Sequence, residues 1–311
     1  MSPSARSSLP SSKMLSPFKH SDTALPRLWC VAASHAPIVA VLARCYGEPR
    51  WTCVLRWNWQ SQTVEEGAWT TMHVRAHRCT LSPDGEFFLY HAEGPSDGPF
   101  SGFFGGAFAV SRLPWLSALT HTDTFGPAGA AVSHDALKDE DQARLWARFE
   151  QWPKYVRDEH WPLHLGPGWT ALSMEQAARF GVKTDDRGHL AAISELSGTR
   201  MAILAVVDAE RSKHDDPLWS LWHDSLRYFL VSPCDPARSA TALPGVRWLH
   251  AAKAGHLLLA DDQAVLKVVR FRQGSDPAHS PHTVFEHSLK TLTPNPRAAP
   301  PWAKAPLSPA R

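Results

Sequence analysis

The sequence predicts an all-β protein, mainly antiparallel, because it contains one characteristic turn and one run of alternating apolar and polar residues. The turn is Ser82-Pro83-Asp84-Gly85, which stands between residues that favour strands. Pro83 presets φ for the first corner, Asp84 can bond to its own backbone, and Gly85 accepts a positive φ. Residues 51–60 alternate apolar and polar side chains, which is typical of a strand with one buried face. We therefore expect antiparallel hairpins joined by glycine-containing turns.

The chain divides by composition into a body and two ends. Residues 1–27 are rich in Ser and Pro, and residues 274–311 are rich in Pro, Ser and His. Neither end has enough apolar surface to offset the entropy lost on ordering, so we expect a disordered arm and a disordered tail. Residues 28–273 are expected to form the folded body. Hydrophobic residues make up 43% of the chain, which is enough for a substantial core.

Charge is unevenly distributed along the chain. The whole chain has a formal net charge of +2, whereas residues 1–27 carry +3 and residues 288–311 carry +4. Residues 28–287, between these two segments, therefore carry about −5. A mildly acidic body argues against nucleic acid as the main partner.

Further elements are predicted within the body. Residues 136–151 predict one inserted helix, because Asp135 can cap it, apolar side chains share one face and Pro153 ends it. Residues 199–208 predict a buried central strand, on the basis of Met201, Ile203, Leu204, Val206 and Val207. The last strong strand is predicted at residues 265–271.

Two consecutive stretches carry a resemblance to a known fold family. Residues 54–67 hold the series Arg-Trp-Asn-Trp-Gln and then turn, like the end of a propeller blade. Residues 81–90 are similar to the opening of the next blade in TolB-like and WD40-like repeats, which place Ser-Pro-Asp-Gly before an apolar strand. Asn58 stands where those repeats usually have Asp, and the Gly-His pair of regular WD40 blades is absent. Weaker likenesses occur at residues 183–193 and 248–268.

The resemblance implies an irregular β-propeller-like protein with one inserted α-helix and disordered termini. At about 40–45 residues per blade, the body has room for five or six blades. The spacing of the likenesses is irregular, which excludes a strict repeat array. Propellers bind partners across their loop-lined faces, so the resemblance implies a non-enzymatic protein-binding or scaffold module.

Two aromatic clusters are the candidate partner-binding residues. The glycine-rich loop 94–106 contains Phe100, Phe103 and Phe104, and a second cluster contains Trp219 and Trp222. One reading is that both clusters are buried and pack the core. The other is that they are exposed and mark a surface for another protein, since aromatic anchors carry much of the binding energy at interfaces.

A metal-dependent hydrolase is the main alternative function. The chain has 17 histidines, and His73 and His77 have the i, i+4 spacing that places two ligands on one helix face. Glu65 or His91 would complete a ligand set. The residues around His73 favour strand or loop, however, and the chain has no His-Glu-x-x-His motif and no paired CxxC. We therefore expect hydrogen-bonded or surface histidines, with neither metal nor cofactor.

Signatures of other enzyme classes are also missing from the sequence. No Gly-x-Ser-x-Gly elbow and no phosphate-binding glycine loop with its Lys are present. Adjacent carboxylates at Asp185-Asp186 and Asp261-Asp262 lack the arrangement that acid–base work requires. No catalytic residue is therefore predicted.

Two features of the sequence indicate the cellular compartment: the five cysteines and the first apolar run. An odd number of cysteines without CxxC spacing predicts buried free thiols and a reducing cytoplasm, with Cys234 the most exposed. The apolar run 28–43 is interrupted by Pro37 and is too short to cross a membrane. An exported protein with its mature N-terminus near Cys45 is the third hypothesis.

Overall fold

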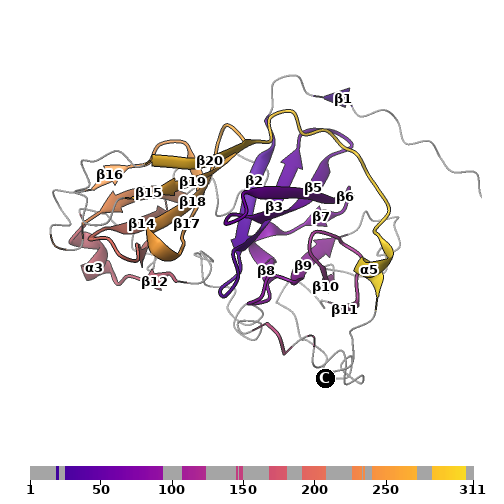
Figure 1. Cartoon of the computed structure of the whole chain (residues 1–311), viewed down its shortest axis with the longest axis horizontal. Helices are drawn as coiled ribbons and strands as arrows, with labels where there is room; N and C mark the ends of the chain where they lie inside the picture. Colours follow the sequence, from indigo (N-terminus) through magenta and orange to yellow (C-terminus); the bar gives the residue numbers. More distant parts are fainter. Residues whose placement is uncertain are drawn as a thin grey trace, which may run out of the picture.

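The computed structural model confirms the all-β prediction. It describes residues 19–20, 25–93, 107–123, 145, 147–149, 168–180, 191–207, 226–232, 234, 240–271 and 282–305. These residues form four larger antiparallel sheets in a propeller-like arrangement (Figure 1). Two short α-helices, α3 (Met174–Ala178) and α5 (Pro301–Lys304), accompany the sheets in this part of the chain.

Sheets 1 and 2 come from the first half of the chain. Sheet 1 has the order β2-β3-β5-β6, and these strands are β2 (Arg27–Ala32), β3 (Ile38–Cys45), β5 (Trp51–Asn58) and β6 (Thr63–Thr70). Sheet 2 has the order β11-β10-β9-β7, with β8 also paired to β9. Its strands are β7 (His73–Val74), β8 (Thr80–Leu81), β9 (Phe87–Glu93), β10 (Ala107–Arg112) and β11 (Thr120–Asp123).

Sheets 3 and 4 come from the second half. Sheet 3 runs β12-β13-β14-β15-β16, with β12 (Thr170–Ala171), β13 (Ala191–Glu195), β14 (Ala202–Val207), β15 (Leu226–Val231) and β16 (Thr241–Ala242). Sheet 4 runs β17-β18-β19-β20, with β17 (Val246–Ala251), β18 (His256–Asp261), β19 (Val265–Arg270) and β20 (His282–Ser288). The central strand predicted at residues 199–208 is β14, which pairs with β13 on one side and β15 on the other.

The sheets pack in the order 3, 4, 1, 2, and sheet 1 is buried on both faces. Along β3, Val39 and Val41 share a core cluster with residues of sheet 4, such as Leu258. The intervening Ala40 and Leu42 pack against sheet 2. Successive side chains of a strand point to opposite faces, so one strand supplies two cores.

This layering corrects one sequence prediction. Residues 51–60 were expected to form a strand with one buried face, yet Trp51 to Leu55 of β5 are all buried. Leu55 and Trp57 face sheet 4, and Val54 faces sheet 2. The alternation in the sequence reflects two different neighbours, because sheet 1 has a packed sheet on each side.

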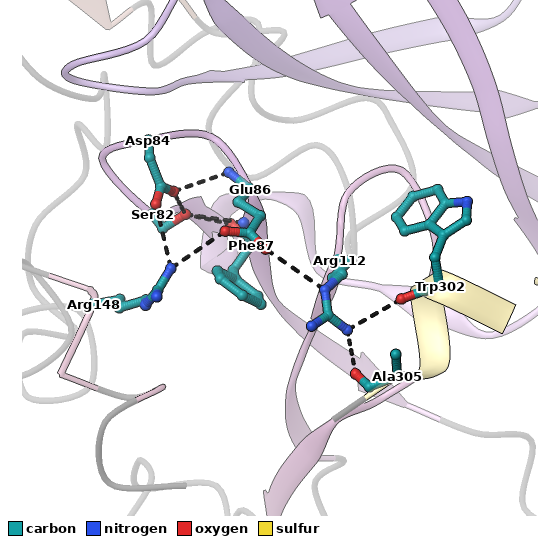
Figure 2. Close-up of polar contacts among 8 residues, drawn as sticks. All are labelled: Ser82, Asp84, Glu86, Phe87, Arg112, Arg148, Trp302 and Ala305. Atoms are coloured by element: carbon teal, nitrogen blue, oxygen red, sulfur yellow. Dashed lines mark hydrogen bonds and ion pairs between the residues drawn. The ribbon is translucent and has the colours of Figure 1, made fainter. Parts of the chain in front are cut away.

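The turn at residues 82–85 connects β8 to β9 (Figure 2). Its backbone is closed by the Gly85 N–H, which donates to the Ser82 carbonyl at 2.8 Å. The Asp84 carboxylate accepts from the Ser82 hydroxyl at 2.6 Å and from the Glu86 N–H at 3.0 Å. Gly85 has φ of +71°, and a Cβ there would lie 2.6 Å from Cβ of Ile38. The turn therefore needs glycine for both its backbone and its packing against sheet 1.

The C-terminal region differs from the sequence prediction. Residues 274–311 were expected to be a disordered tail, but His282–Ser288 form β20, which pairs with β19 in antiparallel fashion with one register shift. Residues 289–305 then form what we call the strap. In Figure 1 the strap leaves β20, passes beside sheet 1 and ends at α5, next to β10. It is held by contacts rather than by its own composition: Leu289 is buried, and Ala303 is fully buried.

The predictions of blade number, of a disordered arm and of an inserted helix agree with the described residues only in part. The described residues form four larger sheets, against the five or six blades for which the body has room. In the predicted disordered arm, β1 (Lys19–His20) pairs with β4 (Gly47–Glu48), and β2 begins at Arg27. Most of the predicted helix at 136–151 lies outside the described residues. Of its members, Leu145 and Phe149 pack on the outer face of sheet 2. None of the helices in the described part has the length and hydropathy that a bilayer crossing requires.

Candidate functional site

A hollow of about 360 Å³ opens between sheet 1 and sheet 4. On one side lies the turn from β5 to β6, and on the other lies the short connection η4 (Lys253–Gly255) between β17 and β18. The lining residues are Trp59, Gln60, Gln62, Lys253, Ala254, His256, Val268 and Val284. We call this hollow the Trp59 groove. Its volume lies at the lower end of the range found for ligand-binding pockets.

Two aromatic rings form one wall of the groove. The indole of Trp59 and the imidazole of His256 lie with their centroids 5.6 Å apart and their planes at 41°. The main-chain N–H of Trp59 donates to the Pro37 carbonyl at 3.1 Å. This hydrogen bond fixes the backbone at the end of β5. The His256 Nδ1 lies 3.1 Å from the Lys253 carbonyl oxygen. A carbonyl oxygen only accepts, so Nδ1 of His256 is the donor in this contact, and Nε2 is the ring atom left for a ligand.

Both rims of the groove hold a residue in the left-handed region. Gln62 has φ of +58° and Ala254 has φ of +57°. Residues other than glycine rarely adopt this backbone conformation. It persists where surrounding contacts impose it. On the sheet 1 rim those contacts come from Asn58, whose Oδ1 accepts from the N–H groups of Gln60 and Ser61, both at 3.1 Å. The rim amides are therefore presented by a fixed turn.

The sheet 4 side of the groove is basic. His256, Arg270 and His282 are direct cross-strand neighbours on β18, β19 and β20, so their side chains lie on one face. Val268, two residues before Arg270, is on that same face and lines the groove. Lys253 and Arg270 are both exposed, and neither forms an ion pair with another described residue. The groove thus combines an apolar floor with a positive rim.

The histidines proposed as metal ligands are arranged differently from the sequence hypothesis. His73 Nδ1 lies 3.3 Å from Glu93 Oε2, and Arg75 Nε donates to Glu93 Oε1 at 2.5 Å. Glu65, the expected third ligand, lies on β6 of sheet 1. The side chain of His77 is outside the described residues. Across the described ranges, His, Cys, Asp and Glu side chains form no group of three or more that could hold a metal ion.

The carboxylate of Glu93 is instead part of an ion cluster. Burial by itself would raise the pKa of Glu93, but hydrogen bonds from His73 and Arg75 and the charge of Arg75 lower it to about 2. His91, the other expected ligand, is fully buried, and its ring meets that of Phe108 at 4.8 Å. The cluster is a structural feature of the β7–β9 pair.

The aromatic residues predicted to bind a partner, Phe100, Phe103, Phe104, Trp219 and Trp222, lie outside the described residues. Sequence reasoning placed Trp59 on the apolar face of a strand at residues 51–60 and did not single out His256. The available signal was local: Trp59 is the last apolar residue of the alternating run 51–60, and Gln60 and Gln62 follow it in the turn after β5. Nothing in the sequence shows that sheet 4 would approach this turn.

The cysteines follow the prediction of free thiols. Cys30, Cys45, Cys53 and Cys79 are buried, and Cys234 is exposed. Burial raises the pKa of Cys45 to about 12, and it also raises those of Cys30, Cys53 and Cys79. These four thiols remain protonated at neutral pH.

Comparison with known proteins yields no family. No known protein family matches the sequence, and none of the curated proteins matches it. Among solved structures, an uncharacterised protein from Listeria monocytogenes is 11% identical, with a TM-score of 0.23 over 84% of this chain and 65% of that one. An acylaminoacyl peptidase from Pyrococcus horikoshii is 8% identical, with a TM-score of 0.22 over 85% of this chain and 33% of that one. The chain therefore spans less than two thirds of the length of either protein.

Proposed function

We propose that this protein is a non-enzymatic module that binds another protein, and that the Trp59 groove receives a segment of that partner. The observation that carries the proposal is the composition of the groove, in which an apolar floor of Val268 and Val284 meets an aromatic wall and a polar rim. Indole rings recur as anchors at protein interfaces because they bury a large area with few rotatable bonds.

The rim supports a polypeptide ligand in particular. Gln60 and Gln62 are exposed, and each carboxamide offers both a donor and an acceptor. A peptide group has the same pair of functions, so two carboxamides on one turn suit an extended backbone. The floor belongs to the antiparallel pair β19–β20, in which Val284 lies at a register shift between Thr283 and Phe285. A floor formed by paired strands lowers the ordering cost of binding.

We also propose a cytoplasmic location, with the exported form as its competitor. Four buried thiols that take no part in disulfides suit a reducing compartment. N-terminal sequencing of the protein from its native host separates the two: a terminus at Met1 or Ser2 supports the cytoplasm, and one near Cys45 supports export.

The binding proposal is tested by selection from a random peptide library displayed on phage, with the full chain as bait. Selected peptides are then measured by fluorescence anisotropy against three variants. Trp59→Ala removes the aromatic wall, and Gln60→Ala removes one exposed rim amide without touching the core. Trp302→Ala is the matched control, because Trp302 is 49% exposed and lies on the strap, away from the groove.

The expected result is that binding falls about tenfold or more in Trp59→Ala, falls less in Gln60→Ala, and is unchanged in Trp302→Ala. Circular dichroism and thermal unfolding show whether Trp59→Ala is folded. If Trp59→Ala is unfolded, the surface variant Gln60→Ala still tests the proposal. A selection that yields no peptide, or peptides that bind wild type and both groove variants equally, contradicts the proposal.

A further inference from the structure

We infer that the segment received by the Trp59 groove is acidic: a peptide with an apolar residue flanked by Asp or Glu. This inference rests on the proposed function and adds the chemistry of the ligand. It comes from the distribution of charge around the groove, which is opposite in sign to that of the folded body. Residues 28–287 carry about −5, whereas the groove's lining includes one Lys and one His and no Asp or Glu.

The positive charge of the rim comes from Arg270 on β19 and from Lys253 in the connection η4. Arg270 stands between His256 and His282 in the cross-strand row, and Lys253 lies in the connection that leads into β18. Directly paired residues have Cβ atoms about 5 Å apart, so the row forms a continuous edge of cationic and imidazole groups. A ligand that lies along this edge meets at least two fixed positive charges.

The acidic groups of sheet 4 lie away from this edge. Asp261 and Glu286 both pair with Lys267, at 3.1 Å and 3.8 Å. Lys267 is adjacent to Val268 in the strand, so its side chain points to the opposite face from Val268 and Arg270. On one face of sheet 4 the charge of Lys267 is thus neutralised, whereas Arg270 on the other face and Lys253 in η4 form no ion pair with a described residue. That asymmetry favours an anionic ligand on the groove side.

The geometry also orders the parts of the ligand. An apolar side chain fits the floor at Val268 and Val284, where it contacts the Trp59 indole. Residues beside it in the ligand reach outward to the rim, where Lys253 and Arg270 attract carboxylates. Carboxylates of Asp and Glu match Arg well, because the guanidinium binds two oxygens at once.

The test uses the peptides obtained from the phage selection above. Each selected peptide is synthesised in two forms, one as selected and one with every Asp and Glu replaced by Asn and Gln. Anisotropy is measured against wild type, Lys253→Glu and Arg270→Glu. Lys304→Glu is the matched control, since Lys304 is an exposed lysine on α5, outside the groove. These positions are all on the surface, and thermal unfolding verifies each fold.

The selected peptides are expected to be enriched in Asp and Glu relative to the starting library. Their amide forms are expected to bind wild type about tenfold more weakly, and Lys253→Glu and Arg270→Glu are expected to lose a similar factor for the acidic form. Lys304→Glu is expected to bind like wild type. Added salt is expected to weaken the acidic peptides more than their amide forms.

Failure of the inference and failure of the proposed function give different results. If acidic and amide peptides bind equally and both depend on Trp59, the groove binds peptides without a charge requirement, and only the inference is overturned. If a single-stranded oligonucleotide displaces the peptides and its own binding depends on Lys253 and Arg270, the ligand is a polyanion of another class, and the inference is again overturned. If the binding of every selected peptide is independent of Trp59 and of Gln60, the proposed function and the inference are both overturned.

Discussion

Arg112 of β10 donates hydrogen bonds to the main-chain carbonyls of Trp302, at 3.3 Å, and of Ala305, which is 193 positions further along the chain (Figure 2). The same guanidinium faces Glu86 at 3.6 Å and lies over the Phe87 ring. The strap therefore begins at sheet 4, on one side of sheet 1, and its end is bound to sheet 2, on the other side. Arg297 adds a contact midway, at 3.4 Å from Glu66.

Replacing Arg112 tests how much this fastening stabilises the fold. Arg112→Ala removes several charge-assisted bonds from a side chain that is 12% exposed, so we expect a loss of about 2 kcal/mol in the free energy of unfolding. Urea unfolding measures the loss, and hydrogen exchange at Ala303 and Ala305 reports release of the strap. Arg179→Ala, in the exposed pair with Glu175, is the control and is expected to change stability by less than about 0.5 kcal/mol. An unaltered exchange rate in Arg112→Ala would mean that other contacts hold the strap.

Substitutions at two glycines with positive φ, Gly85 and Gly198, distinguish the cost of backbone strain from the cost of overpacking. Gly85→Ala places a Cβ 2.6 Å from Ile38, whereas a Cβ at Gly198 has no atom within 4 Å. Their φ values are similar, +71° and +76°. We expect Gly198→Ala to cost about 1 kcal/mol from the backbone alone, and Gly85→Ala about 3 kcal/mol because overpacking is added. Equal losses in thermal or urea unfolding would show that sheets 1 and 2 can separate to admit the methyl group.

The ion cluster at Glu93 predicts a specific dependence of stability on pH. The pKa of Glu93 falls from its ordinary value of 4.5 to about 2 in the folded protein. A depressed carboxyl pKa stabilises the fold above pH 4.5, and this contribution is lost as the pH falls toward 2. Glu93→Gln is therefore expected to lose on the order of 2 kcal/mol at neutral pH and to converge with wild type near pH 2.

The control for this measurement is Glu65→Gln, which removes an exposed carboxylate from β6. Its stability is expected to run parallel to that of wild type between pH 2 and pH 5. Parallel curves for Glu93→Gln and wild type would contradict the assignment of the depressed pKa to Glu93.

The thiols are expected to react in two classes. Cys234 is exposed, whereas the other four cysteines are buried. A thiol reagent such as Ellman's reagent should therefore modify one thiol quickly in the native protein and the rest only on unfolding. Cys234→Ser should abolish the fast phase. A fast phase that persists in this variant would mean that one of the sheets opens to expose a second thiol.

Local chemistry made part of the fold predictable. The turn at residues 82–85 needed only its own four residues, because Pro, Asp and Gly each restrict or permit a backbone conformation. The strand β14 was also recognisable, since a continuous apolar run is typical of a strand covered on both faces. By contrast, β20 has exposed residues at His282, Thr283 and Glu286 and no clean alternation. It is a strand because β19 presents a free edge to it.

The candidate site was hidden from the sequence for a related reason. Trp59 and His256 lie almost 200 residues apart in the chain, and they meet because sheet 4 packs against sheet 1. The basic edge likewise requires the pairing of three strands. Neither residue has a neighbour in sequence that would reveal its partner.

The amino-acid sequence by itself determined the class of the fold, the glycine-bearing turn and the burial of four thiols, because these depend on the conformational preferences and hydrophobicity of short segments. Tertiary structure alone decided the order of the sheets, the fourth strand of sheet 4, the course of the strap and the composition of the Trp59 groove. Each of these comes from contacts between segments distant in the chain, whose free energy is gained only when whole sheets pack together.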